Sequence, residues 1–359
     1  MSTLLDGVSV QRVHTSRLEV NVLAAGDSSA SHVVVFVHGN VSSSLFWQPV
    51  MLRLAEWGVR SLAIDLRGFG DTQVRPVDAT RGLKDLSDDV AETLEMLAVP
   101  AAHLVGWSMG GGVVMQLMLD YPRIAQTVTL VAPVSPYGFG ATRLDGTLTN
   151  PDAAGTGGGG VNPQFVENLK NQVLGDENAA TALSVYRATY VHDPGAEHLV
   201  EREDLWVESM LSTALGDDNY PGTSQPSEFW PGFKPGERGI LNTMAPTVFN
   251  TAGIVDLVHK PPVLWVHGAD DKIVADTSFV DINYLGQLGA IPGWPGKEAA
   301  PPQPMKQQTR AVLDAYARAG GSFTEVEFSD CGHSPHLEYP DTFLDALGAH
   351  VGIKARISS

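Results

Sequence analysis

Residues 102–112, AHLVGWSMGGG, join an apolar strand pattern to a run of small residues that opens a helix. Within this stretch, Gly106 to Gly110 fit the pattern Gly-x-Ser-x-Gly, with a buried strand before it and a helix starting near Met109. Two glycines permit a sharp turn that presents the hydroxyl of Ser108 at the end of the strand. A chain with 37 glycines also produces such patterns by chance, so this turn alone leaves the function open.

Apolar runs and helical spacing extend the same strand-then-helix order along much of the chain. Short apolar and β-branched runs predict buried strands at residues 33–37, 60–66, 102–106, 125–131, 263–267 and 323–328. Apolar residues at helical spacing predict helices at residues 49–56, 83–97, 305–319 and 340–351. This order is typical of a mostly parallel sheet flanked by helices. The sequence therefore predicts an α/β fold.

The alternation of strand and helix patterns is lost between Pro133 and Lys260, which predicts an insertion in the sheet-forming chain. We expect residues 1–132 and 261–359 to form one catalytic core, and residues 133–260 to form a mainly helical cap, or lid. Helices are predicted in this cap at residues 163–174, 177–190, 201–215 and 241–258. A second insertion, residues 288–304, is rich in Pro and Gly and is predicted to be a loop.

Composition limits the partners that the protein can have. Its 359 residues carry 41 acidic and 23 basic side chains, a net charge of −18 that would repel nucleic acid and anionic membranes. The single cysteine, Cys331, cannot close an internal disulfide, and no cluster has metal-ligand spacing, so we expect neither metal nor cofactor. Without a signal peptide or a run of about 20 apolar residues, we expect a cytoplasmic protein with no membrane span. The oligomeric state is left open.

A serine nucleophile needs a base to take its proton and an acid to orient that base. Of the 11 histidines, only His333 lies in a loop directly after the final predicted strand and before the final helix. His336 is its nearest rival, but we expect it to point elsewhere. Of the other histidines, His38, His103 and His267 adjoin predicted strands, whereas His192, His198 and His259 belong to the insertion.

The acid is expected in the doublet Asp270-Asp271, which follows the predicted strand at residues 263–266. We favour Asp271 over Asp270, and a solvated turn is the alternative, because aspartate is common in turns. With Ser108 and His333, this doublet gives the chain order Ser, Asp, His.

With these motifs, the chain resembles the α/β-hydrolase fold family over two stretches, from about Val33 to Val131 and from Val263 to Val351. Besides the serine turn, residues 38–47 resemble the family's His-Gly oxyanion loop, residues 65–72 its Asp-x-Arg-Gly-x-Gly turn, and residues 268–274 its acid loop. The fourth position of that acid loop is catalytic in the family, which selects Asp271. Related dehalogenases and epoxide hydrolases use an aspartate nucleophile, so Ser108 argues against both.

The resemblance also implies an oxyanion hole. The backbone N–H groups of Met109 and Asn40 should converge on the developing negative oxygen and stabilise it by roughly 3–4 kcal/mol per donor. Two departures from the family are an alanine, Ala275, where proline is frequent, and an unusually long cap.

We therefore predict a serine hydrolase that cleaves a carboxylic ester or lactone of a mainly apolar substrate. Aromatic residues of the cap, among them Trp206 and Trp230, either line its pocket or form the cap's own core. The same triad could instead cleave amides or carbon–carbon bonds, or carry out perhydrolysis. A hydrolase of charged substrates and a non-catalytic binding protein on this fold are further alternatives.

Overall fold

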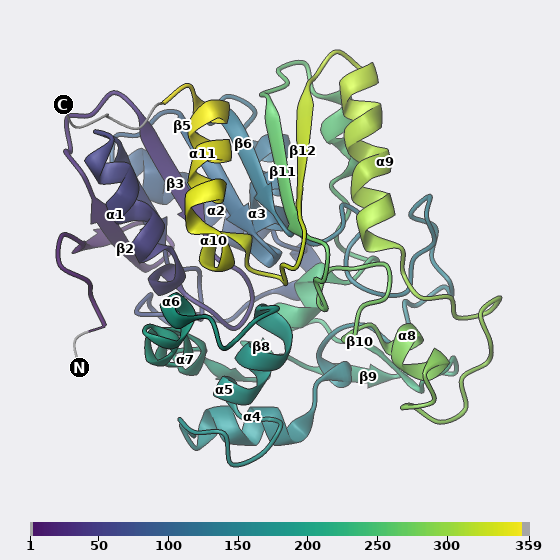
Figure 1. Ribbon diagram of the computed structural model, residues 1–359. Helices are drawn as coiled ribbons and strands as arrows, with labels where there is room; N and C mark the ends of the chain where they lie inside the picture. The colour runs from purple at the N-terminus through teal and green to yellow at the C-terminus, as the bar shows by residue number, and fades with distance from the viewer. Residues whose placement is uncertain (1–2, 354–359) are drawn as a thin grey trace.

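The computed structural model describes residues 3–353, which are built around an eight-stranded sheet in the order β1-β2-β4-β3-β5-β6-β11-β12 (Figure 1). Its pairs from β4 to β12 are parallel, and only β1–β2 and β2–β4 are antiparallel. The strands are β1 (Ser9–His14), β2 (Glu19–Ala25), β3 (Val33–Val37), β4 (Arg60–Ile64), β5 (Ala102–Trp107), β6 (Ala125–Val131), β11 (Val263–Gly268) and β12 (Phe323–Phe328).

Central strands are mostly apolar and largely buried because helices cover both faces of the sheet. Every residue of β5 and of β11 is buried, and β3 has the sequence VVVFV. The predicted parallel α/β sheet is confirmed. Strands β1 and β2 were not predicted from the sequence. Most residues of β1 are exposed, so its apolar signal is weak.

The flanking helices form two layers. Helices α1 (Gln48–Glu56) and α11 (Pro340–Val351) pack together on one face, and α2 (Lys84–Met96) and α3 (Met109–Asp120) pack together on the other (Figure 1). Helix α9 (Met305–Arg318) packs against β12. The start of α3 and both ends of the other four helices agree with the sequence prediction to within one or two residues. The short helices α8 (Ile282–Gln287) and α10 (Pro335–Glu338) were not predicted.

Residues 133–260 connect β6 to β11, although these two strands are neighbours in the sheet. The inserted elements gather at one end of the sheet, below it in Figure 1. They are α4 (Pro163–Lys170), α5 (Ala182–Val185), a π-helical turn (Tyr186–Tyr190), α6 (Glu197–Val200), α7 (Glu203–Leu211), three short 3-10 helices (Gly158–Gly160, Ile240–Met244 and Ala252–Asp256), and the short strands β7 (Leu215–Gly216), β8 (Tyr220–Pro221), β9 (Ser224–Pro226) and β10 (Phe233–Pro235).

Helices in the insertion are shorter than the sequence predicted. The helix expected at residues 241–258 is wrong, because two 3-10 turns stand there with Pro246 between them. Proline lacks the N–H that a continuous helix needs. The helix expected at residues 177–190 begins only at Ala182, where the side chain of Thr181 caps it.

The second insertion, residues 288–304, contains no helix or strand. It contacts the first one, since Trp230 Nε1 donates to the carbonyl oxygen of Pro292 at 2.9 Å. Across residues 3–353, no helix has the length and apolar character needed to cross a membrane.

Candidate active site

Ser108 stands at the turn between the end of β5 and the start of α3. Its backbone has φ 56° and ψ −120°, a conformation that non-glycine residues rarely adopt. The turn is so tight that a Cβ on Gly106 would overlap the carbonyl oxygen of Gly110. A Cβ on Gly110 would likewise overlap the carbonyl oxygen of Val37. Ser108 itself remains partly exposed, so its hydroxyl is accessible.

Asp271 and His333 meet at the same edge of the sheet, in the loops after β11 and β12. His333 Nδ1 lies 2.9 Å from Asp271 Oδ2, and both side chains are almost completely buried. The other carboxylate oxygen of Asp271 accepts hydrogen bonds from the N–H groups of Ile273 and Val274, at 2.8 and 3.0 Å. These bonds fix the carboxylate, which in turn fixes the ring of His333.

Asp270 takes a different position from its neighbour. Its side chain is about half exposed and lies 3.3 Å from Nδ1 of His192, in the insertion. Of the doublet, Asp271 is the residue that pairs with His333.

Two contacts bring the neighbouring loops to the serine turn. Trp107, which directly precedes Ser108, donates from Nε1 to the carbonyl oxygen of His333 at 2.9 Å. On the other side, a Cβ built on Gly39 would lie 3.0 Å from Cβ of Ser108, so the loop that starts at His38 runs directly past the serine. The serine turn, the histidine loop and the His-Gly loop thus converge.

The N–H groups expected to form an oxyanion hole belong to Asn40 and Met109. Met109 is the first residue of α3, where N–H groups lack partners within the helix and the helix dipole favours negative charge. Within residues 3–353, neither N–H donates to the backbone of another loop or turn. The side-chain oxygen Oδ1 of Asn40 is also buried without a hydrogen-bond partner.

Two other histidines near the site have structural surroundings. His38 Nε2 accepts from the N–H of Leu66 at 3.0 Å, and burial lowers its pKa, so it stays neutral. His336 stacks on Trp47 at 4.3 Å, and within the described chain neither of its ring nitrogens has a hydrogen-bond partner. Burial, and then the proximity of His333, hold the pKa of His336 well below its usual range.

The Asp-x-Arg-Gly-x-Gly turn braces the His-Gly loop. Asp65 accepts from the N–H of Ser44 at 2.7 Å and from that of Asp71 at 3.0 Å. Arg67 forms a two-pronged ion pair with Asp89 of α2, at 2.8 and 2.9 Å. This motif therefore positions the site without reaching the candidate triad.

Aromatic side chains surround the converging loops. Phe46 packs against Trp107 at 5.0 Å and against Trp206 of the insertion at 5.1 Å between ring centroids. Tyr190, also from the insertion, contacts the rings of Trp107 at 5.8 Å and His333 at 6.2 Å. Trp230, by contrast, donates from Nε1 to the carbonyl oxygen of Pro292 in the second insertion. Of the cap aromatics noted in the sequence, Trp206 therefore packs beside the site.

Glu338 is a buried residue at the site that sequence reasoning missed. Its carboxylate accepts from the N–H of Gly332, next to His333, at 2.8 Å, and from the N–H of His192 at 2.7 Å. Burial raises the pKa of Glu338. The sulfur of Cys331 lies 3.5 Å from Glu338 Oε1, and burial raises the pKa of this thiol as well. Glu338 lies on a short helix with no motif around it, so nothing in the sequence signals this contact.

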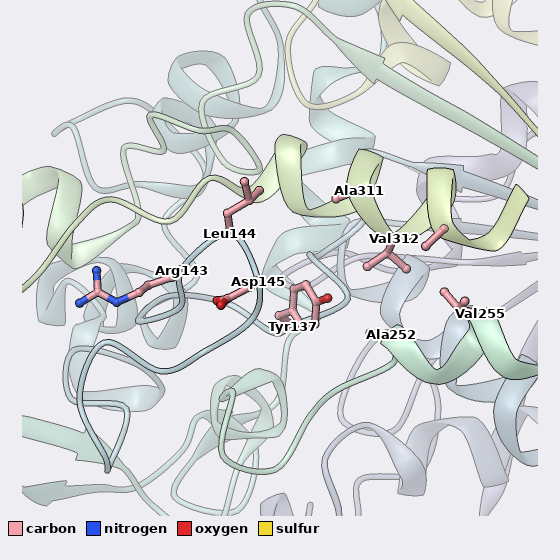
Figure 2. Close-up of a pocket in the computed structure, with 9 residues that line it drawn as sticks. Tyr137, Arg143, Leu144, Asp145, Ala252, Val255, Ala311 and Val312 are labelled. Carbon is pink, nitrogen blue, oxygen red and sulfur yellow. The ribbon is translucent and has the colours of Figure 1, made fainter. Parts of the chain in front are cut away.

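Figure 2 shows a cavity of about 550 Å³ between the segment that follows β6 and helix α9. Its lining is mostly apolar, with Arg143 and Asp145 at the side of the loop. None of Ser108, Asp271 and His333 belongs to its lining. The cavity is therefore separate from the candidate active site.

Among residues 3–353, one group of three side chains could hold a metal ion. His192, Asp270 and Asp330 place their ligand atoms within 4.8 Å of one another. Their wide separation in the sequence explains why spacing did not indicate them. All three are exposed, and an ion pair between His192 and Asp270 already accounts for two of them, so we assign no metal to this group.

Known proteins resemble this chain in sequence and in fold. A model of the alpha/beta hydrolase family matches residues 34–346. The chain belongs to the alpha/beta hydrolase family. The predicted α/β-hydrolase fold, a mostly parallel sheet flanked by helices, is therefore confirmed.

Proteins similar to this chain include an esterase. A bifunctional esterase/perhydrolase, DCH, from Acinetobacter calcoaceticus is 27% identical over 274 residues, which are 73% of this chain and 84% of that protein. RutD from Variovorax paradoxus (strain S110), provisionally named a carbamate hydrolase, is 38% identical over 123 residues, 34% of this chain and 46% of its own. The chain thus spans less than half the length of RutD. The structure of an esterase from Exiguobacterium antarcticum, EaEST, matches 96% of this chain and 100% of its own with a TM-score of 0.59 at 14% identity, which shows the shared fold alone.

Proposed function

We propose that this protein is a serine hydrolase of carboxylic esters or lactones, with Ser108 as nucleophile, His333 as base and Asp271 as the acid that orients it. The observation that carries the proposal is the buried 2.9 Å contact between His333 Nδ1 and Asp271 Oδ2, beside the strained turn of Ser108. With Nδ1–H held by the carboxylate, the second ring nitrogen is left to accept a proton.

In the proposed reaction, Ser108 Oγ attacks the carbonyl carbon of the ester while its proton passes to Nε2 of His333. The carbon–oxygen bond to the alcohol then breaks, and His333 gives its proton to the leaving alcohol. Water attacks the acyl-enzyme with His333 again as base, which releases the acid and restores Ser108. The N–H groups of Asn40 and Met109 stabilise the oxyanion formed in each half of the reaction.

We further propose that residues 133–260 act as a cap over this site and supply part of its apolar wall. Trp206 and Tyr190 of this segment pack against Phe46 and Trp107 next to the nucleophile, which supports a substrate with an apolar group.

The test is the rate of p-nitrophenyl ester hydrolysis by the wild type and by Ser108→Ala. We expect the variant to lose at least about 10³-fold in kcat/KM, because no other group can form the acyl-enzyme. Labelling by a fluorophosphonate probe should occur in the wild type and be absent from the variant. A fully active Ser108→Ala variant with an unchanged melting temperature would overturn the mechanism.

A second candidate activity is perhydrolysis on the same triad, in which hydrogen peroxide replaces water in the attack on the acyl-enzyme. The resemblance to the Acinetobacter esterase/perhydrolase favours it. Measuring ester, lactone, amide and diketone cleavage, together with peracid formation in hydrogen peroxide, separates these chemistries.

A further inference from the structure

One short segment of the insertion, residues 188–192, contacts the acid loop, the histidine loop and the His-Gly loop. The carbonyl oxygen of Ala188 accepts from Nζ of Lys272, in the acid loop, at 2.9 Å. The N–H of His192 donates to Glu338, which also holds the histidine loop. Between these anchors stands Tyr190, the last residue of a π-helical turn. Such turns are rare and occur frequently at functional sites.

The hydroxyl of Tyr190 reaches the His-Gly loop. Its oxygen lies 3.1 Å from the carbonyl oxygen of Val41 and 3.2 Å from that of Asn40, so the phenol donates to this pair of carbonyls. Burial raises the pKa of Tyr190, which keeps the phenol protonated and able to donate.

The loop that receives this hydrogen bond is strained. Val41 is buried and has φ 47°, which β-branched residues rarely adopt because the Cβ meets the backbone. A conformation of this kind persists only where the surroundings hold it. The Tyr190 hydroxyl is such a support, since it binds the carbonyls of the two peptide groups that flank the Cα of Val41.

We propose that Tyr190 is a positioning residue for the oxyanion hole: its hydroxyl holds the Asn40–Val41 backbone so that the N–H of Asn40 points at the developing oxyanion. Tyr190 acts through the backbone and does not touch the reacting atoms. The inference rests on the proposed serine-hydrolase function, and it assigns the insertion a part in transition-state stabilisation besides forming the wall of the pocket.

Tyr190→Phe tests the proposal because it removes the hydroxyl and keeps the ring contacts with Trp107 and His333. We expect kcat for a p-nitrophenyl ester to fall roughly ten- to hundredfold, as for a displaced oxyanion donor, with KM within about twofold. Affinity for an alkyl trifluoromethyl ketone should fall by the same factor. Ser108 Oγ adds to this ketone and passes its proton to His333, so the adduct carries the oxyanion. Affinity for the carboxylic acid product should stay within about twofold.

Tyr186→Phe is the matched control. Tyr186 lies on the same turn and is equally buried, but within residues 3–353 its hydroxyl has no hydrogen-bond partner. We expect this variant to keep the wild-type kcat and ketone affinity.

The outcomes separate the two proposals. If the wild type hydrolyses esters through Ser108 and Tyr190→Phe retains kcat and ketone affinity, the role of Tyr190 is refuted and the proposed function stands. If Tyr190→Phe and Tyr186→Phe lose activity equally, or if KM and product affinity weaken along with kcat, the effect is general packing and the inference fails. If the wild type is neither active nor labelled by a fluorophosphonate, both proposals fall.

Discussion

Asp271 and His333 stand in loops that directly follow strands β11 and β12, whereas Tyr190 and Trp206 arrive at the same place from the insertion between β6 and β11. The first pair is joined by a buried hydrogen bond between charged or polar side chains. The second pair is held mainly by aromatic packing and by hydrogen bonds to backbone carbonyls. The sheet thus supplies the groups suited to chemistry, and the insertion supplies the surroundings that hold them.

This difference has a physical basis. Parallel strands all end at the same edge of a sheet, so residues just after them are brought together whatever the rest of the chain does. The insertion has no such frame. Its helices are short, and its contacts depend on individual side chains such as Tyr190.

The largest effect is expected at the acid. In Asp271→Asn the amide cannot stabilise the histidine cation and favours the wrong ring tautomer, so kcat should fall by about 10³- to 10⁴-fold. Asp270→Asn is the control, because that side chain is about half exposed and forms an ion pair with His192 of the insertion. It should keep kcat within about twofold, as removal of a surface ion pair costs little. Steady-state ester hydrolysis measures both. Equal losses in the two variants would place the acid elsewhere.

Much of the sheet and of the candidate triad could be predicted, because residues that directly follow parallel strands are brought together at one edge of the sheet. The runs at residues 33–37 and 125–131 are largely buried, so their apolar signal marks these strands directly. The run at residues 323–328, FTEVEF, lies at the sheet edge and is marked instead by apolar residues that alternate with polar ones. His333 and Asp271 could then be found by asking which titratable residues follow a strand.

What could not be predicted depends on contacts that leave no periodic pattern. Strands β1 and β2 form an antiparallel edge with mostly exposed residues in β1. Tyr190 and Glu338 act through backbone groups of distant loops, and no spacing in the sequence signals such a bond. In the insertion, apolar spacing overestimated helix length because it does not register breakers such as Pro246.

A second contrast concerns stability. Asp89 lies between Arg17 and Arg67 and is buried, with its oxygens 2.5 and 2.8 Å from their Nε atoms. Asp89→Asn keeps the shape and leaves both guanidinium groups without their main partner, so the free energy of unfolding should fall by about 3 kcal/mol. Urea unfolding measures this loss. A change below about 1 kcal/mol would mean that Asp85, 2.9 Å from Arg17, compensates.

The pH dependence of the free energy of unfolding tests the environment of Asp281, a buried residue that contacts the second insertion. Asp281 accepts from the N–H groups of Asn283 and Gln303, at 3.0 and 2.8 Å, and burial raises its pKa from 3.8 to about 6. Between these values the folded protein binds more protons than the unfolded chain. The contribution of Asp281 to the free energy of unfolding therefore decreases as pH rises from about 4 to 6, by at most roughly 3 kcal/mol.

The measurement is the difference in unfolding free energy between the wild type and Asp281→Asn across this range. We expect the difference to decrease with rising pH, because the other titrating groups are common to both proteins and cancel. A difference that stays constant from pH 4 to 6 would show that the carboxyl titrates normally.

The smallest effect is expected on the surface of the insertion. Asp218 pairs with Arg238 at 2.6 Å, and both side chains are largely exposed. Asp218→Asn is the isosteric counterpart of Asp89→Asn and should cost less than about 1 kcal/mol. Urea unfolding of Asp218→Asn and Asp89→Asn side by side gives the ratio of their losses in the free energy of unfolding. A loss equal to that of Asp89→Asn would remove the contrast between the buried and the exposed pair.

The double attachment of Glu338 sets a rule for engineering this protein. One carboxylate joins His192 of the insertion to Gly332 of the histidine loop. A chimera that grafts the insertion of a relative onto this sheet must therefore carry over residues 188–192 as a unit, or redesign Glu338 with it. Otherwise the graft would leave one oxygen of the buried Glu338 carboxylate without its hydrogen-bond donor, close to the proposed base. Variation intended to change substrate preference is better directed to the parts of the insertion that lie outside this segment.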